Sequence, residues 1–159
     1  MEETTRTDID RTDRRILDLL QREGALSVAE VASRTGLSTT TCWRRIQHLE
    51  TNGVIKGRVA LLDRTALGLD VTIFAHVKLT SQTRDAIAAF AEAIRSRPEV
   101  LDCYTTMGEW DFMLKVVMKD IKAFEAFFLD HLSKLPYVQS INSSVTVTAI
   151  KESTVLPIV

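Results

Sequence analysis

The sequence predicts an α+β protein in which an N-terminal helix-turn-helix is followed by a C-terminal ferredoxin-like βαββαβ sandwich. Two observations support this prediction. Between residues 26 and 53, two short amphipathic segments are joined by a turn at Gly36, which is the layout of a helix-turn-helix. After residue 70, strand-like and helix-like patterns alternate in the order strand, helix, strand, strand, helix, strand, the order of a ferredoxin-like sandwich.

Three helices are expected in the N-terminal domain, residues 1–53. The first runs from Asp10 to Glu23, and its inner side is marked imperfectly, by Ile9, Asp13, Ile16, Leu17 and Leu20. Ser27 is placed to cap the second helix and Ser38 the third, because their hydroxyl oxygens accept the free N–H groups of a first turn. The third helix spans residues 39–51 and ends at a turn formed by Asn52-Gly53.

The third helix has two different faces. Cys42, Ile46 and Leu49 recur at i, i+4 and i+7 and share one apolar face. The opposite face is rich in hydrogen-bonding side chains of the kind that read bases: arginine pairs with guanine, glutamine with adenine, and threonine meets a thymine methyl group or a phosphate. We therefore expect DNA contacts from Ser38, Thr39, Thr40, Thr41, Trp43, Arg44, Arg45, Gln47, His48, Lys56 and Arg58, the flanking members binding phosphate. The alternative is an ordinary amphipathic helix with a solvated outer face.

Composition narrows the classes of function. The 159 residues carry a net charge of −1, which argues against a non-specific nucleic-acid coat, yet residues 38–58 are locally basic. The two cysteines, Cys42 and Cys103, form no CxxC pair, so each is expected to be a buried free thiol, with no metal ion or cofactor. The polar start of the chain has no signal-peptide pattern, and no apolar run reaches the length of a membrane span. We expect a cytoplasmic protein with no membrane partner.

The remaining elements follow in order. Residues 54–62 resemble a strand that serves as a wing or a hinge, within a hinge and linker that spans 54–69. The sandwich, residues 70–150, is expected to contain strands at 71–79, 100–107, 110–118 and 137–150 and helices at 83–97 and 121–135. Gly108-Glu109 fits a two-residue hairpin turn. Residues 151–159 form a C-terminal tail.

One face of the predicted sheet lacks a cover, because both helices of a ferredoxin-like sandwich pack on the same side. Phe74, Val77, Val116 and Val145 cannot all face those helices. Large exposed apolar faces mark partner surfaces, so we expect two sheets to pack face to face in a homodimer. The alternative is a monomer with a half-polar sheet.

Two motifs resemble the leucine-responsive regulator/AsnC (Lrp/AsnC) family of transcription factors. The first is the run from Leu37 to Glu50, followed by Gly53-Val54-Ile55 and residues 60–63. The second is the stretch Gly108-Glu109-Trp110-Asp111-Phe112, which is similar to a hairpin motif of that family. The likeness extends from about residue 9 to the Leu156-Pro157-Ile158 tail.

The resemblance implies a winged helix-turn-helix, a hinge strand, and a ligand-binding domain that forms dimers and assembles further into octamers or rings. It also implies a bacterial regulator of amino-acid metabolism that binds double-stranded DNA in the nucleoid and responds to a small amino acid. The Thr41-Cys42-Trp43-Arg44-Arg45 segment and the tail resemble a cysteine-responsive branch. Many members have proline at or near the position of Thr41, so base contacts there are the least defined.

An amino-acid effector needs donors for its carboxylate, an acceptor for its ammonium group and a pocket for its side chain. Gly108 offers an unobstructed backbone N–H, Asp111 an acceptor, and Thr106 and Met107 lie on the same hairpin. By resemblance, a cleft between dimers is completed by Leu101, Ile121, Ser143, Ser144 and Thr146. The alternatives are that Gly108 only forms a turn and that Asp111 is a solvated or surface-paired acid.

Other classes of function have weaker support. His48, His76 and His131 are scattered, and the chain has no HExxH, P-loop or GxSxG motif, so an enzyme such as a small ferredoxin-like isomerase is disfavoured. The main alternative is an amino-acid-sensing module that does not itself bind DNA.

Overall fold

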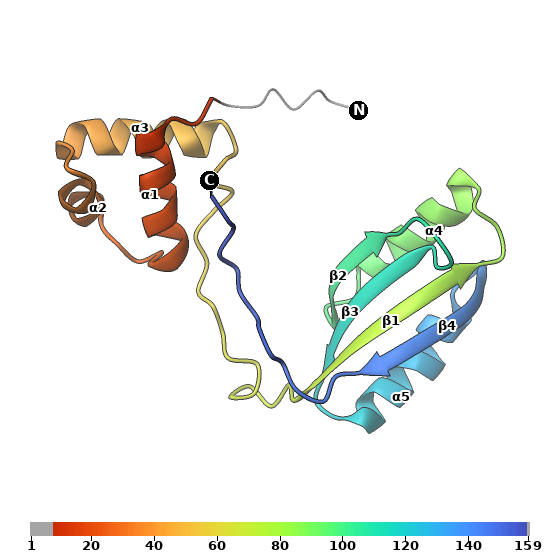
Figure 1. The fold of residues 1–159 in the computed structure, drawn as a ribbon. Helices are drawn as coiled ribbons and strands as arrows, with labels where there is room; N and C mark the ends of the chain where they lie inside the picture. The colour runs from red at the N-terminus through yellow and green to blue at the C-terminus, as the bar shows by residue number, and fades with distance from the viewer. Residues whose placement is uncertain (1–7, 159) are drawn as a thin grey trace. The chain divides into compact units, whose positions relative to one another are not determined.

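The computed structural model describes residues 8–158 of the chain, which form two compact units (Figure 1). The helical unit contains the chain up to Leu61 together with the segment that begins at Lys151, and the sheet unit contains Leu62–Ile150. The predicted α+β class is therefore confirmed. Within the described part of the chain, no helix is both long and apolar enough to cross a membrane.

The helical unit is built from α1 (Arg11–Arg22), α2 (Val28–Thr35) and α3 (Thr39–Thr51). The predicted caps are confirmed, because Ser27 accepts from the N–H of Glu30 and Ser38 from the N–H of Thr41. The backbone turns between α2 and α3 at Gly36, whose φ of 73° lies in the left-handed region that glycine adopts without strain. The three helices enclose one core of buried side chains: Ile16, Leu20, Leu26, Val31, Ala32, Cys42, Ile46 and Leu49.

A charged residue on the inner side of α1 is explained by an ion-pair network. Asp13 is 7% exposed, and its carboxylate lies 2.8 Å from Nη1 of Arg45, which also contacts Asp10 at 2.7 Å. Asp10 in turn caps α1 by accepting from the N–H of Asp13. These contacts join the start of α1 to the middle of α3, and the two aspartates raise the pKa of the Arg45 guanidinium.

The strand expected at residues 54–62 does not form, which corrects that prediction. Val54 and Ile55 instead donate their N–H groups to the carbonyl of Leu49 and pack against the core of the helical unit. Beyond them residues 56–63 form no helix, strand or turn, and Val59 is 84% exposed. A strand needs a neighbour to pair with its N–H and C=O groups, and the described part of this chain supplies none here.

The sheet unit contains β1 (Val71–Leu79), α4 (Arg84–Arg95), β2 (Val100–Thr105), β3 (Phe112–Met118), α5 (Ile121–Asp130), the short 3-10 helix η1 (Leu132–Lys134) and β4 (Val138–Val145). The strand order is β2-β3-β1-β4 with antiparallel neighbours, the order of a ferredoxin-like sandwich, as predicted. Both α4 and α5 lie on the same side of this sheet (Figure 1).

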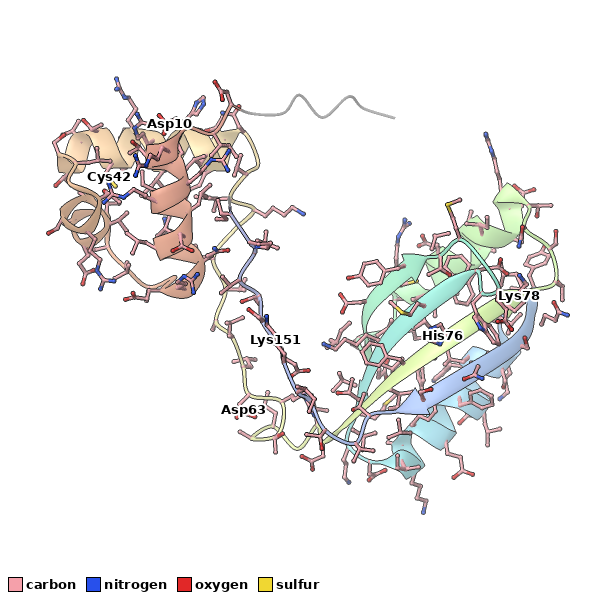
Figure 2. The ribbon with its side chains drawn as sticks, in the orientation of Figure 1. Asp10, Cys42, Asp63, His76, Lys78 and Lys151 are labelled. Atoms are coloured by element: carbon pink, nitrogen blue, oxygen red, sulfur yellow. The ribbon has the colours of Figure 1, made fainter. Side chains whose placement is uncertain are left out.

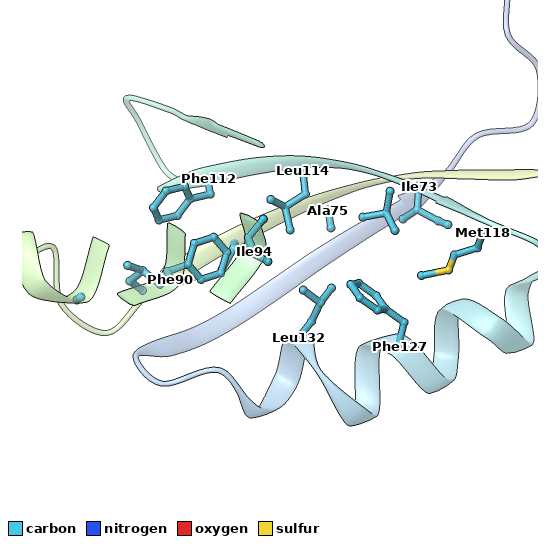
Figure 3. Close-up of a cluster of buried hydrophobic side chains, with 13 residues drawn as sticks. Ile73, Ala75, Phe90, Ile94, Phe112, Leu114, Met118, Phe127 and Leu132 are labelled. Carbon is cyan, nitrogen blue, oxygen red and sulfur yellow. The ribbon is translucent and has the colours of Figure 1, made fainter. Parts of the chain in front are cut away.

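The core of the sheet unit lies between the sheet and the two helices (Figure 3). The odd-numbered residues of β1 from Ile73 to Leu79 are buried there, and the rings of Phe90 and Phe112 pack with centroids 4.4 Å apart. Val77 and Val116 also belong to this core, whereas Phe74 lies on the opposite side of the sheet, so the four apolar residues do not all face the helices. Val145 is paired with Ile73 and shares its side of the sheet.

The uncovered face, which we call the open face, is mixed in polarity rather than largely apolar. By register and strand alternation it carries Phe74, His76 and Lys78 on β1, Met113 and Lys115 on β3, and Ser140, Asn142 and Ser144 on β4. His76 lies on this face (Figure 2), and its ring is 6.1 Å from that of Trp110.

Several element ends differ from the prediction, above all at the hairpin. Gly108-Glu109 is not a two-residue turn, because the last hydrogen-bonded pair joins the N–H of Thr106 to the carbonyl of Asp111, leaving the loop 107–110. Asp111 is held from the other side by β1, since its own N–H donates to the carbonyl of Val77. Asp111 thus joins both neighbours of β3, since its carbonyl accepts from Thr106 on the β2 side and its N–H donates on the β1 side.

Candidate functional site

The two faces of α3 are those that its sequence predicts. Cys42, Ile46 and Leu49 are buried in the helical unit, with exposures of 0–2%. The opposite surface exposes the side chains of Ser38, Thr39, Thr40, Trp43, Arg44, Gln47 and His48, while Thr41 is half-buried. Lys56 and Arg58 are exposed beyond the end of the helix. The outer face of α3 therefore has the donors and acceptors that reading a major groove requires.

Contacts within the helical unit distinguish the basic residues of this surface. Arg45 is held by Asp10 and Asp13, so it stabilises the packing of α1 on α3. Arg58 lies 3.5 Å from Glu50, a weak exposed pair. Arg44 is exposed and makes no ion pair with any residue that the structure describes. Its guanidinium is consequently the one in α3 that is available to an incoming base.

A second candidate site is a cavity of about 310 Å³ in the sheet unit, at the hairpin between β2 and β3. Four of its lining residues were expected from the sequence: Thr106, Met107, Gly108 and Asp111. Four others were not: Gln82, Ile87, Thr105 and Phe112. Of the remaining predicted ligand residues, Leu101 lies on β2, Ile121 begins α5, Ser143 and Ser144 lie on β4, and Thr146 follows β4; these do not line the cavity.

Asp111 is the most constrained group of this cavity. It is 8% exposed, and one carboxylate oxygen accepts from the N–H of Leu79 at 2.7 Å. The other oxygen accepts from Nε2 of Gln82 at 2.7 Å and lies 3.6 Å from the ammonium of Lys78. Asp111 is thus neither solvated nor a simple surface acid. It fastens the hairpin to the end of β1 and to the loop that follows.

The contact with Asp111 fixes the orientation of the Gln82 side chain. An ionised carboxylate accepts hydrogen bonds and donates none, so the amide of Gln82 must present its NH₂ group to Asp111. The amide oxygen Oε1 then points away from that carboxylate. Because Gln82 lines the cavity, an oriented hydrogen-bond acceptor is available at its wall.

The loop at the mouth of the cavity exposes backbone donors. Gly108 has a φ of 137°, and no atom lies within 4 Å of the place where a Cβ would stand. In the described part of the chain, its N–H donates to no protein acceptor. The neighbouring Met107 is fully exposed, while Ile87 and Phe112 supply apolar surface. The site therefore combines a free donor, an oriented acceptor and apolar walls.

The remaining reactive side chains do not assemble into another site. Cys42 is buried, as expected, but Cys103 is exposed, because it lies on β2, an edge strand with a neighbour on one side only. Burial raises the pKa of the Cys42 thiol, and partial loss of solvent around Sγ raises that of Cys103. His131 follows the end of α5, where its ring packs 5.6 Å from Phe127. Among residues 8–158, no group of three His, Cys, Asp or Glu side chains is arranged to hold a metal ion.

Comparison with known proteins identifies the family. Residues 9–56 match the profile described as winged helix-turn-helix DNA-binding, and residues 72–156 match the Lrp/AsnC ligand binding domain. The chain belongs to the Lrp/AsnC family. The helical unit is accordingly the winged helix-turn-helix of an Lrp/AsnC protein, a family of transcriptional regulators rather than enzymes.

Individual relatives resemble the chain over nearly its whole length. The DNA-binding transcriptional activator DecR of Escherichia coli K12 is 34% identical over 150 residues, which cover 94% of this chain and 99% of DecR. The Bkd operon transcriptional regulator of Pseudomonas aeruginosa is 39% identical over 137 residues, 86% of this chain and 90% of the relative. The crystal structure of the regulator NMB0573 from Neisseria meningitidis in complex with L-Met has a TM-score of 0.90 at 37% identity, covering 94% of this chain and 97% of that one.

Proposed function

We propose that this Lrp/AsnC protein binds an operator through α3 and that an amino acid bound in the hairpin cavity alters its affinity for that DNA. The observation that carries the proposal is the cavity itself. Four residues chosen from the sequence for amino-acid binding line it, next to an oriented acceptor and apolar side chains. The complex of NMB0573 with L-Met supports an amino-acid ligand for a structure of this kind.

The chemistry of the cavity suggests how the effector is recognised. The N–H of Gly108 is suited to the carboxylate, since it has no protein acceptor of its own within residues 8–158. Oε1 of Gln82 is suited to the ammonium group, because the aspartate beside it keeps that oxygen turned outward. In this proposal Asp111 positions Gln82 rather than holding the ammonium alone. Ile87 and Phe112 favour an effector with an apolar side chain.

The identity of the effector is proposed more narrowly as an apolar or sulfur-containing amino acid. The volume of about 310 Å³ accommodates a side chain as large as that of methionine. Cysteine is a second candidate, because the segment from Thr41 to Arg45 and the Leu156-Pro157-Ile158 tail resemble a cysteine-responsive branch of the family. Its smaller side chain would leave part of the apolar wall uncovered.

Assembly of the chain is also part of the proposal. We infer that two open faces pack together in a homodimer through Phe74 and Met113, and that dimers assemble into an octamer. Leu101, Ile121, Ser143, Ser144 and Thr146, which lie away from the cavity, would then meet the effector at a cleft between dimers. A cytoplasmic location, on the nucleoid when DNA is bound, follows from this role.

A thermal-shift screen of the twenty amino acids, followed by gel shifts on DNA upstream of the gene, tests the function. We expect one or a few apolar amino acids to raise the melting temperature and to change the DNA affinity. The matched control is the same compound without its amino group, 4-(methylthio)butanoic acid in the case of methionine. No stabilisation by any amino acid would overturn the effector proposal, and no shift of upstream DNA would overturn the operator proposal.

A further inference from the structure

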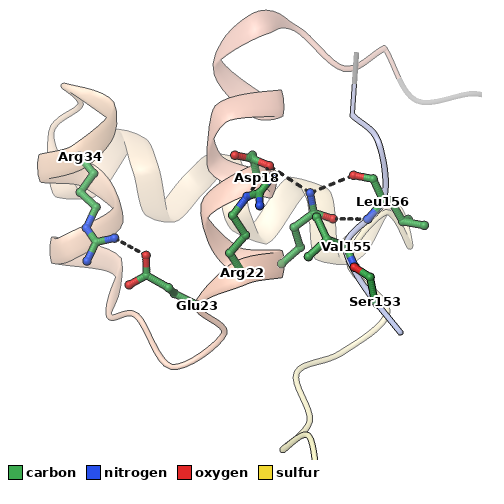
Figure 4. A network of polar contacts seen from close by, with 8 residues as sticks. Asp18, Arg22, Glu23, Arg34, Ser153, Val155 and Leu156 are labelled. Atoms are coloured by element: carbon green, nitrogen blue, oxygen red, sulfur yellow. Dashed lines mark hydrogen bonds and ion pairs between the residues drawn. The ribbon is translucent and has the colours of Figure 1, made fainter. Parts of the chain in front are cut away.

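The C-terminal segment returns to the helical unit and is held there by the side chain of one glutamine on α1. Nε2 of Gln21 donates to the carbonyl of Leu156 at 3.1 Å, and the N–H of Leu156 donates to Oε1 of Gln21 at 2.9 Å (Figure 4). Both hydrogen-bonding groups of one peptide residue are thus paired with both groups of one side-chain amide. This is the pairing that a neighbouring strand would provide.

The glutamine is itself oriented by a contact within α1. Nε2 of Gln21 also lies 3.2 Å from the carboxylate of Asp18, one turn earlier on α1, and that carboxylate is held by Arg22 at 3.0 Å. Since a carboxylate only accepts hydrogen bonds, the NH₂ end of the amide is fixed on this side and Oε1 is left for a donor. A single orientation of Gln21 therefore matches the peptide group of Leu156.

The burial of the segment fits backbone recognition. Lys151 to Thr154 are exposed, and the side chain of Leu156 is 70% exposed, so the amide pair does not depend on it. Val155 and Ile158 are partly buried. Val155 and Ile158 thus lose contact with water, while the N–H and C=O groups of Leu156 between them keep hydrogen-bond partners. Both conditions are needed for stable docking.

The path of the chain makes this contact a second connection between the two units. After β4, Thr146 is fixed to the sheet unit by its N–H and its hydroxyl group, which both donate to the carbonyl of Thr72. The residues from Thr146 to Leu156 then span at most about 36 Å when fully extended. The helical unit is thus attached both through the linker at residues 56–70 and through this tail.

We propose that α1 is a docking surface for residues 151–158 of the same chain, and that this docked strap transmits the state of the sheet unit to the DNA-binding unit. The second part of the proposal rests on the proposed function, because its readout is the effect of an amino acid on DNA affinity. Gln21 is the residue on which both parts depend. Its side chain is outside α3 and outside the hairpin cavity.

Hydrogen exchange in the full-length protein tests the docking. The amide of Leu156 should be protected in the wild type, and Gln21→Ala should speed its exchange by about 10-fold, since one accepting group is lost. Gln139→Ala, an exposed glutamine on β4, is the matched control and should leave that exchange unchanged. Unprotected exchange in the wild type, or equal protection in Gln21→Ala, would overturn the docking.

A thiol cross-linker distinguishes docking within one chain from exchange between two copies. In a Cys103→Ser background, cysteines introduced as Gln21→Cys and Leu156→Cys should be joined by a short bismaleimide into a product of monomer mass. A product of dimer mass would overturn the same-chain assignment. The exchange measurement above does not require an effector, so it decides the docking even when the proposed function fails.

The coupling between amino-acid binding and DNA binding is measured as the ratio of the DNA affinities with and without the amino acid that stabilises the wild type. We expect Gln21→Ala to bind that amino acid normally while its affinity ratio falls to less than about half of the wild-type ratio. Gln139→Ala should keep the full ratio. If Gln21→Ala keeps the wild-type affinity ratio, the docked strap does not transmit the effect of the amino acid to the DNA-binding unit. A wild-type protein that responds to no amino acid would overturn the proposed function instead.

Discussion

Substitutions of Asp111 separate its support of the hairpin from its orientation of Gln82. Asp111→Ala removes the acceptor of the Leu79 N–H, the partner of Gln82 and the charge beside Lys78. A buried donor left without an acceptor costs about 1–3 kcal/mol, and a hydrogen bond to a charged group contributes about 1.5–3 kcal/mol. The partly exposed pair with Lys78 adds less than about 1 kcal/mol. Because these contributions overlap, we expect the free energy of unfolding of the sheet unit to fall by about 3 kcal/mol.

Asp111→Asn keeps the shape of the side chain and one oxygen for Leu79, so it should cost only about 1 kcal/mol. Its NH₂ group then faces Gln82, where two donors would meet. The amide of Gln82 must rotate to present Oε1 to the new asparagine, which turns its own NH₂ group toward the cavity. That group repels an ammonium ion, so effector affinity should fall by about 10- to 100-fold, as for the loss of a hydrogen bond to a charged group.

The two tryptophans allow the units to be followed separately. Trp43 lies in the helical unit and Trp110 in the sheet unit, so urea unfolding of a Trp43→Phe background reports the sheet unit alone. Calorimetry gives the effector affinity of each variant. Glu109→Gln removes an exposed charge from the same loop and is the matched control. Full effector affinity in a folded Asp111→Asn protein would refute the argument from the orientation of Gln82.

Three further outcomes follow from the structure. Arg44→Ala should weaken operator binding by about 1–3 kcal/mol in gel shifts if its free guanidinium reads a base, and an unchanged affinity would exclude that role. The pKa of Asp10 is lowered by a backbone N–H in the first turn of α1 and by Arg45. The ionised Asp10 therefore stabilises the fold above its ordinary pKa, and this stabilisation is lost as the pH falls through the lowered pKa. We expect Arg45→Met to reduce the dependence of unfolding on acid pH, followed by circular dichroism. In the native protein an alkylating reagent should label Cys103 and spare the buried Cys42. The labelling of Cys103 should speed up toward alkaline pH, because the thiolate is the reacting form and partial loss of solvent raises the pKa of this thiol; labelling of both cysteines at equal rates by mass spectrometry would contradict the structure.

Local chemistry explains which parts of the fold could be predicted from the sequence. The caps at Ser27 and Ser38 and the buried stripe on α3 depend on residues three or four positions apart, and each is found as expected. The strand order follows from the succession of elements. The segment at residues 54–62 has a strand-like composition, but a strand also requires a partner, which composition does not record.

Contacts between distant residues explain what the sequence could not reveal at the candidate sites. Arg45 has the composition and position of a phosphate-binding residue, yet its ion pairs reach Asp10 and Asp13, more than thirty residues earlier. Gln82 follows β1 in a loop with no motif, and only folding brings it to Asp111. A polar residue beside a strand end is a weak signal by itself, and an acid in a predicted hairpin gives no indication of which donors will reach it.

The two glutamines held by aspartates support each other's interpretation. Nε2 of Gln21 lies against Asp18, and Nε2 of Gln82 lies against Asp111, so in both cases the carboxylate fixes which end of the amide is left for another partner. In the helical unit that end is occupied, because Oε1 of Gln21 accepts from the N–H of Leu156. In the sheet unit Oε1 of Gln82 accepts from no group in the described part of the chain, and its residue lines a cavity. The same device that binds a backbone N–H on α1 is thus available, at the hairpin, to a donor from outside the protein, and an ammonium group is the donor that every amino acid brings.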